Sequence, residues 1–177
     1  MKDATARSIL NTASGLIAER GCRGMSLGDT AKELGISKGT LSYYYPTKQE
    51  LVMGVCADCT KALGDRLLAW VDSVSPEQDQ AEAIGRLAEA ALEEPGLRLF
   101  VALYNGAEPE SELEAEVDRA MSEWNVMLEV GAMRFKPSVS NKLRRVLPAV
   151  LPFLCGLAAL NADPDYAKEA FTAFVLG

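Results

Sequence analysis

The sequence contains no histidine among its 177 residues. This absence excludes Ser-His-Asp hydrolysis, Cys-His nucleophiles and zinc sites that use imidazole. No apolar run approaches the roughly 20 residues that a bilayer span requires. The four cysteines lack the density of a secreted disulfide scaffold and indicate a reducing compartment. We therefore expect a cytoplasmic protein that is not an enzyme, with no metal, no cofactor and no membrane partner.

Charge is unevenly distributed along the chain. The net charge is −7, yet residues 1–50 carry +2 and residues 51–177 carry −9. An acidic protein repels nucleic acid at long range, but a basic N-terminal part does not share that repulsion. The asymmetry predicts two parts with different partners, which we place at residues 1–46 and 47–177.

Apolar residues recur with helical periodicity in almost every segment, and the sequence lacks β-branched runs bounded by hairpin turns. The fold class is therefore expected to be all-α. Near the N-terminus, Ser26 and Asp29 form a capping pattern that starts one short helix, and Gly35 ends it. Ser37 caps a second helix over about 38–44, and Pro46 stops it. Two short helices around a glycine-containing turn predict a helix-turn-helix.

The outer face of the second short helix is a candidate reader of the DNA major groove. Leu41 is expected to point inward and to leave the neighbouring polar side chains outside. Lysine and hydroxyl groups bond phosphates and base edges, and a tyrosine ring suits thymine methyl groups. Lys48, at the start of the following helix, is expected to anchor a phosphate. The candidate residues are Lys38, Gly39, Thr40, Ser42, Tyr43, Tyr44 and Lys48.

The stretch SLGDTAKELGISKGTLSYYYPTKQELV, residues 26–52, resembles the DNA-binding signature of the TetR family of transcriptional repressors. Two positions depart from the usual pattern, because Thr30 replaces an isoleucine and Ser42 replaces a phosphate-contacting tyrosine. By this resemblance, Ser26 and Lys48 hold phosphates, Tyr44 reaches the DNA backbone, and bases are approached by Lys38, Gly39, Thr40 and Tyr43. The resemblance further implies a C-terminal helical domain for ligand binding and dimerisation.

A recognition helix of two turns reads only a few base pairs, so a symmetric dimer on a palindromic operator is expected. The resemblance places the dimer surface on the last two helices. An intramolecular core would use the same apolar spacing, and that alternative stays open. The candidate interface residues are Phe153, Leu157, Leu160, Phe171, Phe174 and Val175.

The resemblance also implies an inducer, a small molecule that enters the C-terminal domain and releases the DNA. Methionine and aromatic side chains suit a largely apolar pocket. Ordinary core packing would produce the same stripe of residues. The candidate pocket residues are Trp70, Phe100, Leu103, Tyr104, Met121, Trp124, Met127 and Leu128.

Two other functions are compatible with the sequence. Cys56 and Cys59 form a C-x-x-C motif, which in a reducing cell occurs in thiol redox proteins. No second cysteine pair and no histidine completes a metal shell around it. The helix-turn-helix could also contact protein, in a helical interaction adaptor. The first hypothesis remains a homodimeric repressor that binds double-stranded DNA.

Overall fold

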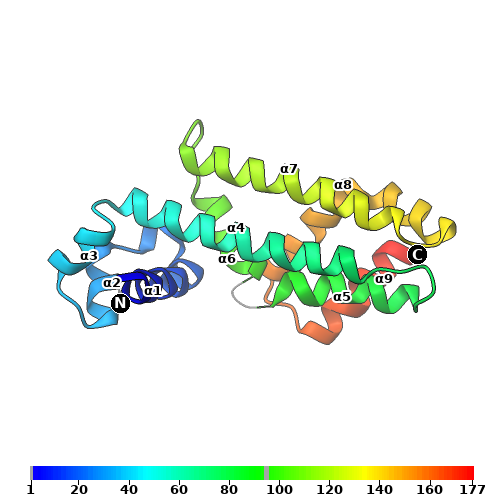
Figure 1. Ribbon diagram of the computed structural model, residues 1–177, viewed down its shortest axis with the longest axis horizontal. Helices are drawn as coiled ribbons and strands as arrows, with labels where there is room; N and C mark the ends of the chain where they lie inside the picture. Colours follow the sequence, from blue (N-terminus) through cyan, green and yellow to red (C-terminus); the bar gives the residue numbers. More distant parts are fainter. Residues whose placement is uncertain (1, 94–95) are drawn as a thin grey trace. The chain divides into compact units, whose positions relative to one another are not determined.

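The computed structural model describes residues 2–93 and 96–177, and these residues form helices joined by short turns, without a β-strand (Figure 1). The expected all-α fold class is confirmed. In chain order the helices are α1 (Lys2–Gly24), α2 (Leu27–Leu34), α3 (Lys38–Tyr44), α4 (Lys48–Ser73), α5 (Gln80–Leu92), α6 (Gly96–Gly106), α7 (Glu112–Met133), α8 (Pro137–Ala159) and α9 (Pro164–Leu176). None of the described helices is both long and apolar enough to cross a membrane.

The chain divides into two compact units. The N-terminal unit comprises Met1–Thr60 and Leu99–Val117, and the C-terminal unit comprises Lys61–Arg98 and Asp118–Gly177. Helices α4, α6 and α7 contribute residues to both units. The functional division predicted between residues 46 and 47 falls just before α4 begins, and it stays a prediction.

The N-terminal unit is built on a core beneath the first four helices. Ile9, Ile17, Leu41 and Leu51 are almost completely shielded from solvent. Helix α1 packs against α2, and α2 packs against α3. Within α1 the helical geometry is interrupted at Gly21, whose φ of 73° lies in the region that favours glycine. The two short helices therefore rest on a buried platform that fixes their orientation within this unit.

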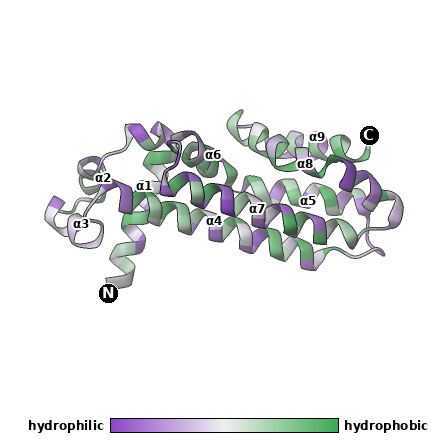
Figure 2. Cartoon of the chain, turned by 90° about the horizontal axis from the view of Figure 1, so that it is seen from above, coloured by the Kyte–Doolittle hydropathy of each residue, from purple (hydrophilic) through white to green (hydrophobic). Residues whose placement is uncertain are grey.

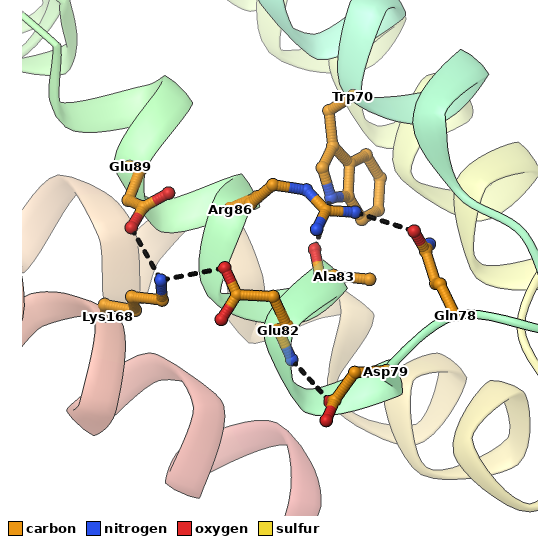
Figure 3. A network of polar contacts seen from close by, with 8 residues as sticks. All are labelled: Trp70, Gln78, Asp79, Glu82, Ala83, Arg86, Glu89 and Lys168. Carbon is orange, nitrogen blue, oxygen red and sulfur yellow. Dashed lines mark hydrogen bonds and ion pairs between the residues drawn. The ribbon is translucent and has the colours of Figure 1, made fainter.

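In the C-terminal unit, α5 packs along α9, and α8 contacts both (Figure 1). Helix α5 is amphipathic, with hydrophobic residues gathered on one side, as the green and purple shading shows (Figure 2). Its buried side includes Ile84 and Leu87, whereas Glu82 and Glu89 are exposed. The ammonium group of Lys168 on α9 lies 3.0 Å from the Glu82 carboxylate and 2.8 Å from that of Glu89 (Figure 3). Buried apolar residues and the two ion pairs of Lys168 thus join α5 to α9.

Candidate nucleic-acid interface

Helix α2 is held at both ends by the residues that the sequence pattern indicates. The Ser26 hydroxyl oxygen accepts a hydrogen bond from the Asp29 backbone N–H at 3.1 Å. At the other end Gly35 adopts φ 69°, and its N–H bonds back to the last turn of α2. Thr30 is fully buried, and its hydroxyl donates to the Ser26 carbonyl oxygen at 3.0 Å. Threonine at this position therefore leaves no unpaired hydroxyl in the core.

Helix α3 has seven residues and presents one face to solvent. The Ser37 hydroxyl oxygen caps it by accepting from the Thr40 N–H at 3.0 Å. Leu41 is the one residue of this helix that is fully buried, and it anchors α3 to the core. The polar candidates stay outside because helical geometry turns them away from Leu41. The exposed residues of this face are Lys38, Gly39, Thr40, Ser42 and Tyr43.

The two tyrosines at the end of α3 differ in their surroundings. Tyr43 is 67% exposed, whereas Tyr44 is half-buried. Their rings meet edge to face, with centroids 5.3 Å apart and planes at 88°. This packing limits the rotation of the outer ring, because edge-to-face contacts between aromatic rings are favourable. Tyr43 is therefore a large aromatic group held out toward solvent at the end of the exposed face of α3.

Ser26 and Lys38 lie close together at Gly28, in the first turn of α2. A Cβ atom at Gly28 would sit 3.2 Å from the Lys38 Cε atom and 3.6 Å from the Ser26 hydroxyl oxygen. The absence of a side chain there leaves room for the lysine. The Lys38 ammonium group, which suits phosphate oxygens, thus lies near the Ser26 hydroxyl, which itself donates to the Asp29 carboxylate at 2.5 Å.

Lys48 begins α4 and is held by its own chain. Its ammonium group donates to the Arg23 carbonyl oxygen at 3.3 Å, and its side chain is half-buried. Thr47 caps the same helix, because its hydroxyl oxygen accepts from the Glu50 N–H at 3.1 Å. The lysine charge therefore lies near a helix N-terminus, where the helix dipole also favours an anion.

The predicted pocket residues are divided between the two units. Trp124 and Leu128 line a cavity of about 30 Å³ in the C-terminal unit. Trp70 is buried, and its indole N–H donates to the Ala83 carbonyl oxygen at 2.7 Å (Figure 3). Met121 and Met127 are half-buried in α7. The remaining three belong to the N-terminal unit, where Phe100 and Leu103 are buried and Tyr104 is exposed.

Sequence reasoning missed nine of the eleven residues that line that cavity, and Arg66 is one of them. It is the charged member of a lining that is otherwise apolar among the described residues. Arg66 lies three residues after Leu63 and four before Trp70, so it shares their face of α4. A single arginine inside an apolar helical stripe was the signal that could have identified it.

The predicted dimer residues lie at different depths within the C-terminal unit. Phe171 and Val175 are buried by the chain itself, and so is Leu157. Phe153 and Phe174 are half-buried, with stacked rings whose centroids are 4.4 Å apart. Leu160 is 81% exposed. Part of this apolar set thus forms intramolecular core, and Leu160 points to solvent.

The C-x-x-C motif lies within α4 rather than at a helix start. Cys56 and Cys59 are both buried, and all four cysteines are free thiols. A redox pair requires an accessible thiolate. The surroundings of this motif do not provide one.

Comparison with known proteins places the helix-turn-helix in a family. Residues 9–55 match the sequence profile described as "Bacterial regulatory proteins, tetR family". The HTH-type transcriptional regulator CymR of Pseudomonas putida is 28% identical over 75 residues, which cover 42% of this chain and 37% of CymR. The chain therefore matches less than half the length of that relative.

Two solved structures share the fold over nearly the whole chain. A protein from Saccharomonospora viridis, solved in complex with choline, has a TM-score of 0.77 at 21% identity and covers 98% of this chain and 96% of its own. The TetR family transcriptional regulator PfmR from Thermus thermophilus has a TM-score of 0.69 at 23% identity and covers 94% of each chain. The expected resemblance is confirmed: the helix-turn-helix, over residues 9–55, matches the tetR family of bacterial regulatory proteins.

Proposed function

We propose that this chain is a homodimeric repressor that binds a palindromic DNA operator and is released from it by a small, largely apolar inducer. The observation that carries the proposal is the solvent face of α3. Buried Leu41 holds the helix, while Lys38, Thr40 and Tyr43 remain exposed. Such a face offers the hydrogen-bonding groups and the apolar ring that read base edges in the major groove.

The residues around α3 supply contacts to the DNA backbone. Ser26 caps the start of α2, and Lys48 lies at the start of α4. Phosphate contacts fix the position of a protein on the duplex, whereas base contacts specify the sequence. We assign Ser26, Tyr44 and Lys48 to phosphates, and Lys38, Gly39, Thr40, Ser42 and Tyr43 to the groove.

A dimer is proposed because seven helical residues read too few base pairs to single out one site in a genome. Two symmetry-related copies double the sequence that is read. The exposed apolar residues Leu160, at the end of α8, and Tyr166, on α9, are 81% and 62% exposed and offer a surface for the second copy. Phe153, half-buried on α8, extends the same apolar set.

The inducer site is assigned to the cavity beside Trp124 and Leu128. Apolar lining with few polar groups is typical of small-molecule sites. The structural relative from Saccharomonospora viridis was solved in complex with choline, which supports a small-molecule ligand for a chain of this fold. The four free thiols are compatible with action in a reducing cytoplasm.

The proposal is tested by selecting sites for the full chain from a random pool of DNA duplexes. We expect a palindromic consensus, and a mass of two chains per selected duplex in sedimentation analysis. Affinity should fall by more than about tenfold between roughly 50 and 200 mM salt, because each phosphate contact releases counterions. Failure to enrich any sequence would refute the proposal, and binding that is insensitive to salt would favour the adaptor alternative.

A further inference from the structure

A second cavity, of about 340 Å³, lies within the N-terminal unit. It is lined by the end of α1, the start of α4 and the segment that joins α6 to α7. Small-molecule sites in proteins measure roughly 300–1,000 Å³. The volume therefore suits a small ligand of about the size of an amino acid.

Two contacts hold the walls of this cavity together. At the end of α6, a Cβ atom on Gly106 would lie only 2.6 Å from the Cys22 Cβ atom, so glycine is what allows α6 to approach α1 this closely. The side-chain amide of Gln49 on α4 donates to the Glu112 carboxylate on α7 at 3.2 Å. Segments that are far apart in the sequence are thus joined around the cavity, which is formed before a ligand binds.

Charges of both signs line the cavity. Arg23 and Lys48 come from the end of α1 and the start of α4, whereas Glu108 and Glu112 come from the segment that leads into α7. Within the described parts of the chain, neither cation is ion-paired with either carboxylate, and the Arg23 guanidinium and the Glu108 carboxylate have no partner. The Lys48 ammonium group donates one hydrogen bond, to the Arg23 carbonyl oxygen. Each of these charged groups therefore retains hydrogen-bonding capacity for a ligand.

We propose that this cavity binds a zwitterion with an apolar side chain, such as a hydrophobic amino acid. The carboxylate of the ligand lies on Arg23 and Lys48, and its ammonium group lies on Glu108 and Glu112. A simple anion meets the two carboxylates and a simple cation meets the two basic groups, so each gains attraction on one side and repulsion on the other. A dipolar ligand pairs with both sides, and its net charge of zero equals that of the four lining charges.

The apolar part of the lining accommodates the side chain of the ligand. Val52 and Leu113 are buried and Met53 is half-buried, and methionine adapts its shape to varied apolar groups. The charged side chains are more exposed, and water screens ion pairs at a protein surface. Apolar contact therefore supplies most of the affinity, and the charges favour the zwitterion over its singly charged analogues.

Lys48 connects this cavity to the DNA. The ligand carboxylate and a DNA phosphate compete for the same ammonium group. Binding of the ligand does not depend on the assignment of Lys48 to a phosphate, whereas this competition rests on the proposed function. Saturating ligand should therefore weaken binding to selected and random duplexes alike and reduce the salt slope by about 1.

The experiment titrates the full chain with L-leucine, 4-methylpentanoate and 3-methylbutan-1-amine by calorimetry. The second probe lacks the ammonium group of leucine, and the third lacks its carboxylate. We expect leucine to bind at least about fivefold more tightly than either analogue. Equal binding of the three probes, or no binding of leucine, would overturn the inference whether or not any variant folds.

Two variants locate the probe within the cavity. Arg23→Gln and Glu108→Gln should each weaken leucine binding by about twofold to fivefold. The arginine variant should leave the amine unaffected, and the glutamate variant should leave the carboxylate probe unaffected. Lys32→Gln and Glu33→Gln, which remove exposed charges of the same unit outside the cavity, should change none of the three. Unchanged leucine binding by both cavity variants would contradict the inference.

DNA binding is measured on the same samples, with and without leucine. Sequence-selective DNA binding without leucine binding refutes the zwitterion site alone. Leucine binding without sequence-selective DNA binding refutes the proposed function alone. If leucine binds and the affinity for DNA does not change, the proposed competition at Lys48 is wrong.

Discussion

Trp70 of α4 packs directly on Gly131 of α7, where a Cβ atom would come within 2.4 Å of the Trp70 Cζ3 atom. The reciprocal arrangement occurs nearer the start of the two helices, between Gly64 of α4 and Trp124 of α7. A Cβ atom on Gly64 would lie 3.5 Å from the Trp124 indole nitrogen. Both helices therefore run in the same direction in the C-terminal unit. Each places a tryptophan over a glycine of the other, and the buried indoles fill the space between them.

Replacing Gly131 by alanine should destabilise the protein. The Trp70 ring cannot withdraw without breaking its hydrogen bond to the Ala83 carbonyl oxygen. Overpacking a core costs up to about 3 kcal/mol, which exceeds the roughly 1 kcal/mol that alanine gains over glycine in a helix. We expect a net loss of about 2 kcal/mol, measured as a Tm lower by about 4–8 °C.

Gly64→Ala is the matched control for this substitution. Its Cβ would lie in ordinary van der Waals contact with the Trp124 indole nitrogen, and the helix would gain propensity. Stability should stay unchanged or rise by up to about 1 kcal/mol. Equal destabilisation by the two alanines would contradict the close packing inferred at Gly131.

Lys168 should make stability fall at alkaline pH. The Glu89 and Glu82 carboxylates raise the pKa of this ammonium group above its ordinary value of 10.5. Because the folded pKa lies above the unfolded one, the stabilisation is complete below about pH 10 and is lost as pH rises through the folded pKa. We expect the free energy of unfolding of Lys168→Met, measured by urea denaturation between neutral pH and about pH 11, to fall less with rising pH than that of the unmodified chain.

Lys61→Met provides the comparison, since Lys61 pairs with Asp65 on the exposed surface of α4 within one helix. Removing the Lys61 ammonium group should leave the fall of the free energy of unfolding with alkaline pH close to that of the unmodified chain. If the Lys168 variant loses as much free energy of unfolding at alkaline pH as the unmodified chain does, the ion pairs between α5 and α9 do not cause that loss.

The four thiols should react slowly in the folded protein. Burial raises the pKa of the Cys155 thiol to about 11, which lowers its thiolate fraction near pH 8 by about a hundredfold. Burial likewise raises the pKa of Cys22, and Cys56 and Cys59 are buried. We expect an aromatic disulfide reagent to label four thiols promptly in urea and none promptly in buffer. Rapid native labelling at Cys56 or Cys59 would revive the redox alternative.

Local features of the fold could be predicted from the sequence because each acts within one turn of chain. The Ser26 cap and the left-handed Gly35 need only their immediate neighbours. The positions of Phe171 and Val175 could not be predicted, since an apolar stripe looks the same whether its own chain or a second copy covers it. The contact of Trp70 with Gly131 joins two distant segments, so no local pattern indicates it.

The proposed division between base and phosphate contacts makes Tyr43 and Lys48 separable. Tyr43→Ala removes a mostly exposed ring and its edge-to-face contact with Tyr44, so stability should fall by no more than about 1.5 kcal/mol. Its effect should appear as lost preference for the selected site, with binding to random duplex unchanged. Lys48→Ala should instead weaken binding to both duplexes and reduce the salt slope by about 1.

Two further variants decide which groups are responsible for the preference for the selected site and for the salt dependence of binding. Tyr43→Phe keeps the ring and removes the hydroxyl, so retained preference would assign the reading to ring contact with thymine methyl groups. Lys32→Ala removes an exposed lysine of α2 that is assigned no DNA contact, and it should leave the salt slope within error. If Tyr43→Ala keeps full discrimination between the two duplexes, the assignment of Tyr43 to the bases is wrong, and the reading must lie with Lys38 and Thr40 earlier in α3.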